Sequence, residues 1–367
     1  MHSRHRVAAA LTAFAALLVT GCSAAGATEQ PSTAPVSSGP VAPLAEVDVP
    51  ADPRSIVGPS TAVLADTAIP AIDGDWSPEL PATVTSRDRG GDREVVVERA
   101  DRIVAMDIAG SIASTLAGLG LADRLVGRDV STTFPGTEAL PVITSNGHTV
   151  NSEAILALRP DLVITDGSIG PLDVVEQLRD AGIAVVFVEN LSSFEGVAEL
   201  ARQVGAAVGM TEAGEALATQ LSASIDAKIA EIRSIVPPGD PLRMAFLYLR
   251  GSAGVYYLFG RGTGADALIE ALGGIDVAAE IGIEGTKPMT DEALIAAQPE
   301  LLLVMTEGLE SVGGVEGLIA AQPAVGLTPA GERARFVDMA DAEILSFGPR
   351  TAAVLDALAR AIYAPAG

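Results

Sequence analysis

Cysteine and tryptophan each occur only once in this chain of 367 residues, and aromatic residues make up only 4% of it. A single cysteine excludes an internal disulfide. Basic residues are also scarce, because 23 Lys and Arg stand against 47 Asp and Glu and give a formal net charge of −24. A surface this acidic repels phosphate backbones, so we expect no nucleic acid as a partner. It does suit docking onto a basic protein surface.

The single cysteine lies at an informative place. Arg4 and Arg6 are followed by an apolar segment and then by a small residue directly before Cys22. This arrangement predicts a signal peptide over residues 1–21 that is removed before Cys22. The site resembles the lipobox of bacterial lipoproteins, which implies a lipid-modified (palmitate-bearing) Cys22 on the extracytoplasmic face of the cell membrane. No later stretch approaches the roughly 18 to 20 apolar residues that a membrane-spanning helix needs.

Composition and periodicity divide the rest of the chain. Residues 22–93 are rich in Pro, Ala and Ser, which predicts a lipid-anchored stalk, flexible to about residue 80, and an N-terminal extension. Short ordered patches around Ile56 to Leu64 stay open as an alternative. We expect an N-terminal lobe over residues 94–210 and a C-terminal lobe over residues 237–367. Between them, residues 211–236 carry apolar side chains three or four positions apart, which predicts one long interlobe helix of roughly 39 Å.

Short apolar runs alternate with helix-like segments in both expected lobes. The runs at residues 102–106, 162–165 and 185–188 predict buried strands, and the same rhythm begins again at Leu242. Alternation of this kind favours βα units and mainly parallel sheets. The sequence therefore predicts an α/β fold.

A repeat indicates that the two lobes are built from the same unit. The segment from Asn151 to Ile164 matches the segment from Thr290 to Leu303, with an offset of 139 residues throughout. In each copy a capping residue begins a short helix, proline ends it and a strand follows. Glu153 and Glu292 occupy the same place in the two copies, near the helix starts, where the helix dipole alone already favours an acidic side chain.

Three residues are candidates for binding a ligand. His148, the one histidine outside the predicted leader, lies in a polar loop just before the helix start at Asn151. Tyr248 lies at the carboxyl end of the predicted first strand of the C-terminal lobe, the edge where open α/β sheets place their sites. Arg250, two positions on, shares its face and can favour ionisation of a phenol whose pKa is ordinarily about 10. A surface histidine, an ordinary tyrosine at the core edge and a surface ion pair remain the simpler alternatives.

Several motifs together carry a resemblance to a known family. They are GRDVSTTFP, NGHTVNSEAILALRPDLVI, YLRG and YLFGRGTGADALI. With the lipobox, the stalk and the repeated unit, they resemble the class III substrate-binding proteins of ABC transporters for haem, siderophores and cobalamin. Within that cluster they are most similar to the haemin-binding lipoproteins of actinobacteria. The resemblance covers about residues 80–364 and implies two lobes with mainly parallel sheets joined by one long helix.

The resemblance also implies roles for particular residues. His148 and Tyr248 would be the axial ligands of haem iron, one from each lobe, and Arg250 would bond the phenolate. Glu153 and Glu292 would meet arginines of the permease. The implied function is capture of haem outside the membrane and its delivery to an ABC permease for iron uptake.

Two other classes of function stay in view. The same fold could carry a ferric siderophore or cobalamin, although a siderophore site needs several cationic groups and only one obvious arginine accompanies the candidate strand. An enzyme is disfavoured because the sequence has no GxSxG, HExxH or CxxC pattern. Tyr256 and Tyr257 either line the site or simply form the next strand.

Overall fold

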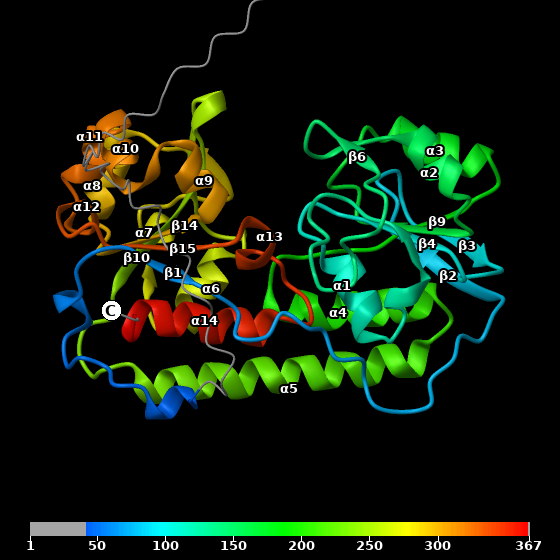
Figure 1. The fold of residues 1–367 in the computed structure, drawn as a ribbon, viewed down its shortest axis with the longest axis horizontal. Coiled ribbons are helices and arrows are strands. Elements are labelled where there is room, and N and C mark those ends of the chain that lie inside the picture. The colour runs from blue at the N-terminus through cyan, green and yellow to red at the C-terminus, as the bar shows by residue number, and fades with distance from the viewer. Residues whose placement is uncertain (1–41, 366–367) are drawn as a thin grey trace, which may run out of the picture. The chain divides into compact units, whose positions relative to one another are not determined.

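Residues 42–365 are described by the computed structural model, whose ribbon is drawn in Figure 1. The predicted signal peptide over residues 1–21, the lipidation site Cys22 and residues 22–41 of the stalk lie outside the described residues. Within the described range, no helix combines the length and the apolar character that crossing a bilayer requires.

The N-terminal lobe is built on a four-stranded parallel sheet of order β5-β4-β8-β9. Every residue of β4 and β8 is buried, as expected for parallel strands covered by helices on both faces. The strands predicted from apolar runs are confirmed to within one residue at each end. The bounds are β4 Ile103–Met106, β5 Leu125–Gly127, β8 Leu162–Thr165 and β9 Ala184–Phe187.

Helices cover this sheet on both sides. Side chains of α1 and α4 belong to one hydrophobic cluster and those of α2 and α3 to another. Two small hairpins, β2–β3 and β6–β7, complete the lobe. The bounds are α1 Ser111–Gly118, η3 Ala122–Arg124, α2 Ser152–Leu158, α3 Asp173–Asp180, α4 Phe194–Ala207, β2 Ala82–Ser86, β3 Arg93–Val97, β6 Thr144–Ser145 and β7 Thr149–Val150.

One long helix connects the lobes, which confirms the predicted fold class. Helix α5 spans Thr211–Ile235 and packs against α4 of the N-terminal lobe and α14 (Thr351–Tyr363) of the C-terminal lobe (Figure 1). Leu217, Leu221 and Ile225 are buried along it, as their helical spacing predicts.

The C-terminal lobe has a mainly parallel sheet of order β1-β15-β14-β10-β11-β13, with the short strand β12 paired to β10. Strands β1, β15, β14 and β10 are parallel, whereas β11 and β13 are antiparallel. The bounds are β1 Ser60–Ala62, β10 Arg243–Arg250, β11 Val255–Phe259, β12 Ile275–Asp276, β13 Thr286–Pro288, β14 Leu301–Met305 and β15 Phe336–Met339.

The helices of this lobe include the second copy of the repeat, α8, which matches α2 in length, capping and exit. Asn151 and Thr290 cap the two helices, and both end in a left-handed residue, Arg159 with φ 49° and Gln298 with φ 45°. The remaining bounds are η4 Gly251–Ala253, α6 Ala265–Ala271, α7 Val277–Glu280, α8 Asp291–Ala297, α9 Thr306–Ser311, α10 Gly314–Ala321, α11 Pro323–Gly326, α12 Pro329–Glu332 and α13 Asp341–Ile344.

The structure departs from the expected flexible stalk over residues 42–55, whereas β1 lies in the stretch around Ile56 to Leu64 for which ordered patches stayed open. Residues 42–64 contain two short helical turns, η1 (Leu44–Glu46) and η2 (Pro53–Ser55), and the strand β1. Strand β1 extends the C-terminal sheet by pairing Ser60 with Val337, and Leu44 is fully buried. Because Ser60 and Val337 lie far apart in the sequence, no local sequence pattern predicts that they pair. The segment is an integral part of the folded body.

Candidate ligand-binding site

His148 lies in the turn of the β6–β7 hairpin and is exposed. The hairpin is tied to its lobe by backbone hydrogen bonds, since the N–H groups of Ile143 and Val150 donate to the carbonyls of Arg128 and Gly170 at 2.9 and 2.7 Å. Arg128 and Gly170 follow the carboxyl ends of β5 and β8. His148 is therefore carried at the carboxyl edge of the N-terminal sheet, in a more ordered setting than the loop predicted from sequence.

Three exposed apolar side chains follow the carboxyl ends of three strands in the sheet of this lobe. Ile108, Val130 and Leu191, after β4, β5 and β9, are 54%, 38% and 52% exposed. The hydroxyl of Ser131 donates to the carbonyl of Ile108 at 2.6 Å and so joins two of these loops. These three residues were not predicted as site residues, although apolar residues that follow predicted strands were a signal for them. Such a set offers burial to an apolar ligand.

A buried pair of carboxyl groups supports the same loops. Asp107 and Asp129 have no exposed surface, and the Asp107 N–H donates to Asp129 at 3.0 Å. Asp107 also accepts hydrogen bonds from the N–H groups of Ser111 and Ile112, at the start of α1. Burial raises the pKa of Asp107, and the neighbouring Asp129 carboxylate raises it further. Burial raises the pKa of Asp129 as well.

Tyr248 lies where β10 has passed its parallel neighbour. Pairing with β14 ends at Leu247, and Tyr248 pairs only with Tyr257 of the antiparallel strand β11. Residues directly opposite on paired strands share a face, so Tyr257 lies on the Tyr248 side, whereas Tyr256 packs against the hydrophobic cluster on the other side. The Tyr248 ring stacks on Phe259, with 5.6 Å between ring centroids. Of the two tyrosines, Tyr257 therefore lies on the same face of the sheet as Tyr248, whereas Tyr256 contributes to the core on the other face.

Arg250 contacts Tyr248, but not in the way the sequence predicts. Its guanidinium carbon lies 4.5 Å from the centroid of the Tyr248 ring, over the ring face. One guanidinium nitrogen donates to a carboxylate oxygen of Asp341 at 2.8 Å and another to the carbonyl of Leu249 at 2.7 Å. The guanidinium is therefore oriented by an acidic residue that follows β15, and it acts on the phenol ring as a cation over an aromatic face.

The structure does not bring all three candidate residues into contact. Tyr248 and Arg250 form one cluster in the C-terminal lobe, and His148 belongs to the N-terminal lobe. No hydrogen bond or ion pair within residues 42–365 joins His148 to either of them. Each group does stand at the carboxyl edge of its own sheet, the edge at which open α/β sheets bind ligands.

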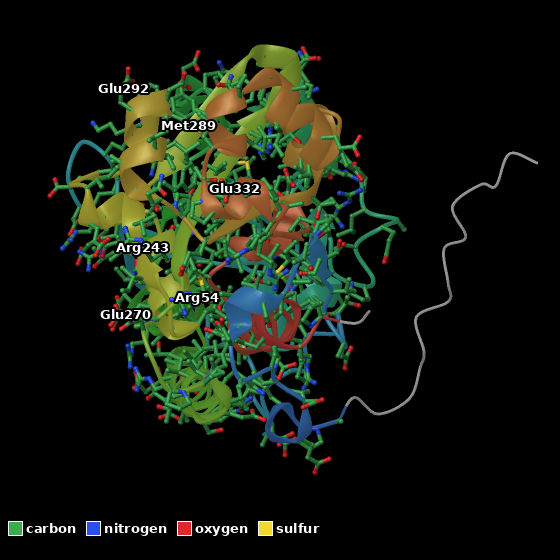
Figure 2. The ribbon with its side chains drawn as sticks, turned by 90° about the vertical axis from the view of Figure 1, so that its left-hand side faces the viewer. Arg54, Arg243, Glu270, Met289, Glu292 and Glu332 are labelled. Carbon is green, nitrogen blue, oxygen red and sulfur yellow. The ribbon has the colours of Figure 1, made fainter. Side chains whose placement is uncertain are left out.

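Glu153 and Glu292 occupy matching and exposed places. Each lies in the first turn of its helix, α2 or α8, two residues after the capping residue. Figure 2 shows Glu292 at the outer end of α8. Their side chains are thus free to meet another protein.

Comparison with known proteins identifies the family. A family model described as a periplasmic binding protein matches residues 107–342. This chain belongs to the periplasmic binding protein family. Membership places it outside the cytoplasm and makes it a substrate-binding protein rather than an enzyme.

Curated relatives and solved structures agree with this assignment. A cobalamin-binding protein of Halobacterium salinarum is 28% identical over 234 residues, which are 63% of this chain and 60% of that protein. The aligned part of the chain thus spans only 60% of the length of that relative. A Bacillus subtilis protein described as an uncharacterized ABC transporter substrate-binding lipoprotein is 26% identical over 63% of this chain and 71% of its own length.

Two solved structures cover more of the chain. The crystal structure of the heme-binding protein HmuT is 39% identical, with a TM-score of 0.79, and the match covers 85% of this chain and 99% of that one. The periplasmic heme-binding protein RhuT from Roseiflexus sp. RS-1 is also 39% identical, with a TM-score of 0.66 over 72% of this chain and 98% of that one.

Proposed function

We propose that this protein captures haem outside the cytoplasmic membrane and delivers it to an ABC permease for iron uptake. The observation that carries the proposal is the pairing of Tyr248 with Arg250 at the carboxyl edge of the C-terminal sheet. A tyrosine oxygen is an axial ligand that haem iron accepts, and the guanidinium over the ring holds that tyrosine at the edge of the sheet. His148, at the corresponding edge of the other lobe, supplies the second axial ligand to the iron.

The matched structures support haem as the cargo. HmuT and RhuT are both described as heme-binding, and each is 39% identical to this chain. Three variants of HmuT have also been solved, in which a histidine, a tyrosine or an arginine is replaced by alanine. In HmuT the replaced arginine lies two positions after the replaced tyrosine, the spacing of Tyr248 and Arg250 here. The agreement in spacing supports Tyr248 and Arg250 as residues of the proposed haem site.

The apolar residues of the N-terminal lobe fit a porphyrin. Haem is a flat ligand with large apolar faces, and covering them gains roughly 25 cal/mol per Å² of apolar surface removed from water. Ile108, Val130 and Leu191 offer such surface at the edge that carries His148. We infer that burial supplies most of the binding free energy, while the two iron ligands supply specificity.

Attachment to the membrane is the second part of the proposal. Cys22, at the end of the predicted signal peptide, would carry the lipid that holds the mature protein at the outer face of the cell membrane. A Bacillus subtilis relative is itself described as a lipoprotein, which supports this assignment. Cys22→Ser should release the mature protein into the medium, and retention of that variant in the membrane fraction would contradict lipidation at this residue.

Docking onto the permease is the third part. Glu153 and Glu292 are exposed at equivalent places of the two lobes, so each lobe presents one carboxylate to the arginines of a permease. Charge reversal in both lobes, Glu153→Arg with Glu292→Arg, should abolish uptake of haemin by cells and leave the haem spectrum of the purified protein unchanged. Normal uptake by this variant would remove the two glutamates as docking contacts.

A competition experiment tests the cargo. The purified mature protein is titrated with haemin, with cyanocobalamin and with a ferric hydroxamate siderophore, and binding is followed by quenching of its single tryptophan and by absorbance. We expect a Soret band that grows to saturation with haemin and survives an excess of the other two ligands. The 28% identical cobalamin-binding relative makes cobalamin the natural rival. Saturable binding of cyanocobalamin without a haem complex would reverse the assignment.

A further inference from the structure

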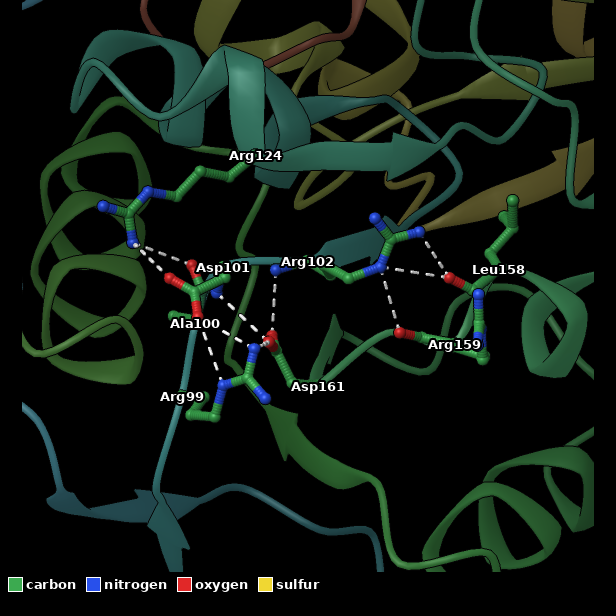
Figure 3. Close-up of polar contacts among 8 residues, drawn as sticks. All are labelled: Arg99, Ala100, Asp101, Arg102, Arg124, Leu158, Arg159 and Asp161. Atoms are coloured by element: carbon green, nitrogen blue, oxygen red, sulfur yellow. Dashed lines mark hydrogen bonds and ion pairs between the residues drawn. The ribbon is translucent and has the colours of Figure 1, made fainter.

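Arg102, directly before β4, contacts the carboxyl-terminal end of α2, the helix that carries Glu153 (Figure 3). The guanidinium of Arg102 donates to the carbonyls of Leu158 and Arg159 at 2.6 and 3.2 Å, at the carboxyl-terminal end of α2. Its backbone is held as well, because the Arg102 N–H donates to the Asp161 carboxylate at 3.0 Å and its carbonyl accepts from the Asp161 N–H at 3.0 Å.

The C-terminal lobe repeats this arrangement with different residues. The guanidinium of Arg243 donates to the carbonyl of Ala297, the last residue of α8, at 2.8 Å. The Arg243 N–H donates to the Glu300 carboxylate at 3.0 Å, and the Glu300 N–H donates back to the Arg243 carbonyl at 2.7 Å. Figure 2 shows Arg243 near one end of α8 and Glu292 at the other. Ala297 and Glu300 stand at the same places in the repeat as Leu158 and Asp161.

A further arginine holds the carboxylate in each lobe. Arg99 lies 3.5 Å from Asp161, and Arg54 donates to Glu300 at 2.7 Å. Arg99 is close to its lobe's strand in sequence, whereas Arg54 comes from the N-terminal segment. The contact between an arginine and this carboxylate is thus present in both lobes, although the arginines come from different segments of the chain.

Helices α2 and α8 depend on such contacts because they are short. Each has seven residues, which is too few for a stable helix in isolation. The carbonyls of the last turn have no partner within a helix, and an arginine placed there satisfies them and interacts favourably with the helix dipole. The N-terminal ends are fixed by the caps Asn151 and Thr290. Arg102 and Arg243 therefore fix the other ends and with them the direction in which each helix points.

We infer that Arg102 and Arg243 are positioning residues for permease docking, which hold Glu153 and Glu292 in a fixed mutual arrangement. This inference rests on the proposed role of the two glutamates. A permease that binds both lobes at once requires a defined spacing between its two contacts. Two helices held by Arg102 and Arg243 supply that spacing without touching the cargo. Loss of these arginine contacts should therefore weaken docking and leave haem binding unchanged.

The experiment compares haemin uptake by cells in which each variant is the sole binding protein, at equal expression. Arg102→Ala with Arg243→Ala should lower the rate at saturating haemin about fivefold, because charge-assisted hydrogen bonds that orient both contacts are lost. The haem spectrum should not change. Arg102→Lys with Arg243→Lys should restore most of the rate, because lysine can still donate to a carbonyl. Arg124→Ala is the matched control: Arg124 belongs to the network in Figure 3 and donates to the Ala100 carbonyl at 2.9 Å rather than to α2.

A double-variant cycle separates positioning from a general loss of structure. If the arginines act through the glutamates, Arg102→Ala and Arg243→Ala should have no further effect in a protein that already carries Glu153→Ala and Glu292→Ala. An undiminished fivefold effect in that background overturns the inference. If the glutamate variants alone leave uptake unchanged, the proposed docking role fails first. If the glutamate variants reduce uptake and the arginine variants do not, only the inference fails.

Discussion

The guanidinium of Arg250 lies over the ring of Tyr248, with 4.5 Å from its central carbon to the ring centroid. Asp341 holds it there through a hydrogen bond of 2.8 Å. The protein's own side chains therefore hold the cation against the proposed iron ligand. Such contacts restrict the phenol ring, and a restricted ligand loses less conformational freedom on binding, which favours affinity.

Replacing this arginine should loosen the haem. We expect Arg250→Ala to release haem about tenfold faster than the parent protein, because the cation–π contact that holds the Tyr248 ring in place is lost. Arg250→Lys should recover only part of the effect, since an ammonium group cannot both cover the ring and bond Asp341 as the planar guanidinium does. Transfer of haem to an excess of a competing haem-binding protein measures the rates. Equal rates for all three proteins would remove Arg250 from the site.

The buried pair Asp107 and Asp129 should make stability depend on pH. Burial raises the pKa of Asp107 in the folded protein above its value in the unfolded chain, which is near 4. The contribution of this pair to the free energy of unfolding therefore decreases as pH rises above about 4. Asp129→Asn removes the neighbouring charge, so its stability should fall less over the same range. Chemical denaturation at several pH values measures both slopes, and parallel slopes would contradict the coupling.

The N-terminal segment should contribute to stability as a core element does. Leu44 is fully buried, whereas Val57 of the same segment is 72% exposed. We expect Leu44→Ala to lower the free energy of unfolding by about 2 to 5 kcal/mol. Val57→Ala should change it by less than about 0.5 kcal/mol. Urea denaturation compares the two, and a negligible effect of Leu44→Ala would restore the view of this segment as a flexible stalk.

Substitution of two glycines in the turn before α6 should distinguish the effect of backbone strain from the effect of side-chain crowding. Gly262 and Gly264 both have positive φ, 80° and 88°, but only at Gly264 would a Cβ meet another side chain, 2.5 Å from the Phe347 ring. Gly262→Ala should cost roughly 1 to 2 kcal/mol of stability, the price of a left-handed backbone. Gly264→Ala should cost about 1 to 3 kcal/mol more, because the Phe347 ring must move. Equal thermal shifts for the two variants would contradict the crowding.

The sequence predicted features that arise from local patterns. The strands around Val104, Ile164 and Val186 and the long helix α5 follow from apolar runs and helical periodicity, and the two copies of the repeat agree down to the left-handed exit of each helix. The pairing of β1 with β15 was missed because Ser60 and Val337 lie far apart along the chain and β1 has only three residues.

The sequence named candidate residues for the site but could not give their contacts. Spacing alone placed Arg250 on the face of Tyr248, which the structure bears out. The role of Asp341 depends on how α13 follows β15, and a contact across 91 residues leaves no signal in a single sequence. The apolar residues Ile108, Val130 and Leu191 share an edge of the sheet only because the parallel strands that precede them end there.

The absorbance spectrum of the haemin complex reports whether His148 and Tyr248 ligate the iron. It is recorded for the parent protein, for His148→Ala, for Tyr248→Phe and for the control Tyr257→Phe, which alters a tyrosine on the same face of the sheet. We expect His148→Ala and Tyr248→Phe each to shift the Soret band and the visible bands, because each removes one axial ligand, and the control to leave them in place. Spectra of His148→Ala and Tyr248→Phe that coincide with that of the parent protein would contradict ligation by these two residues.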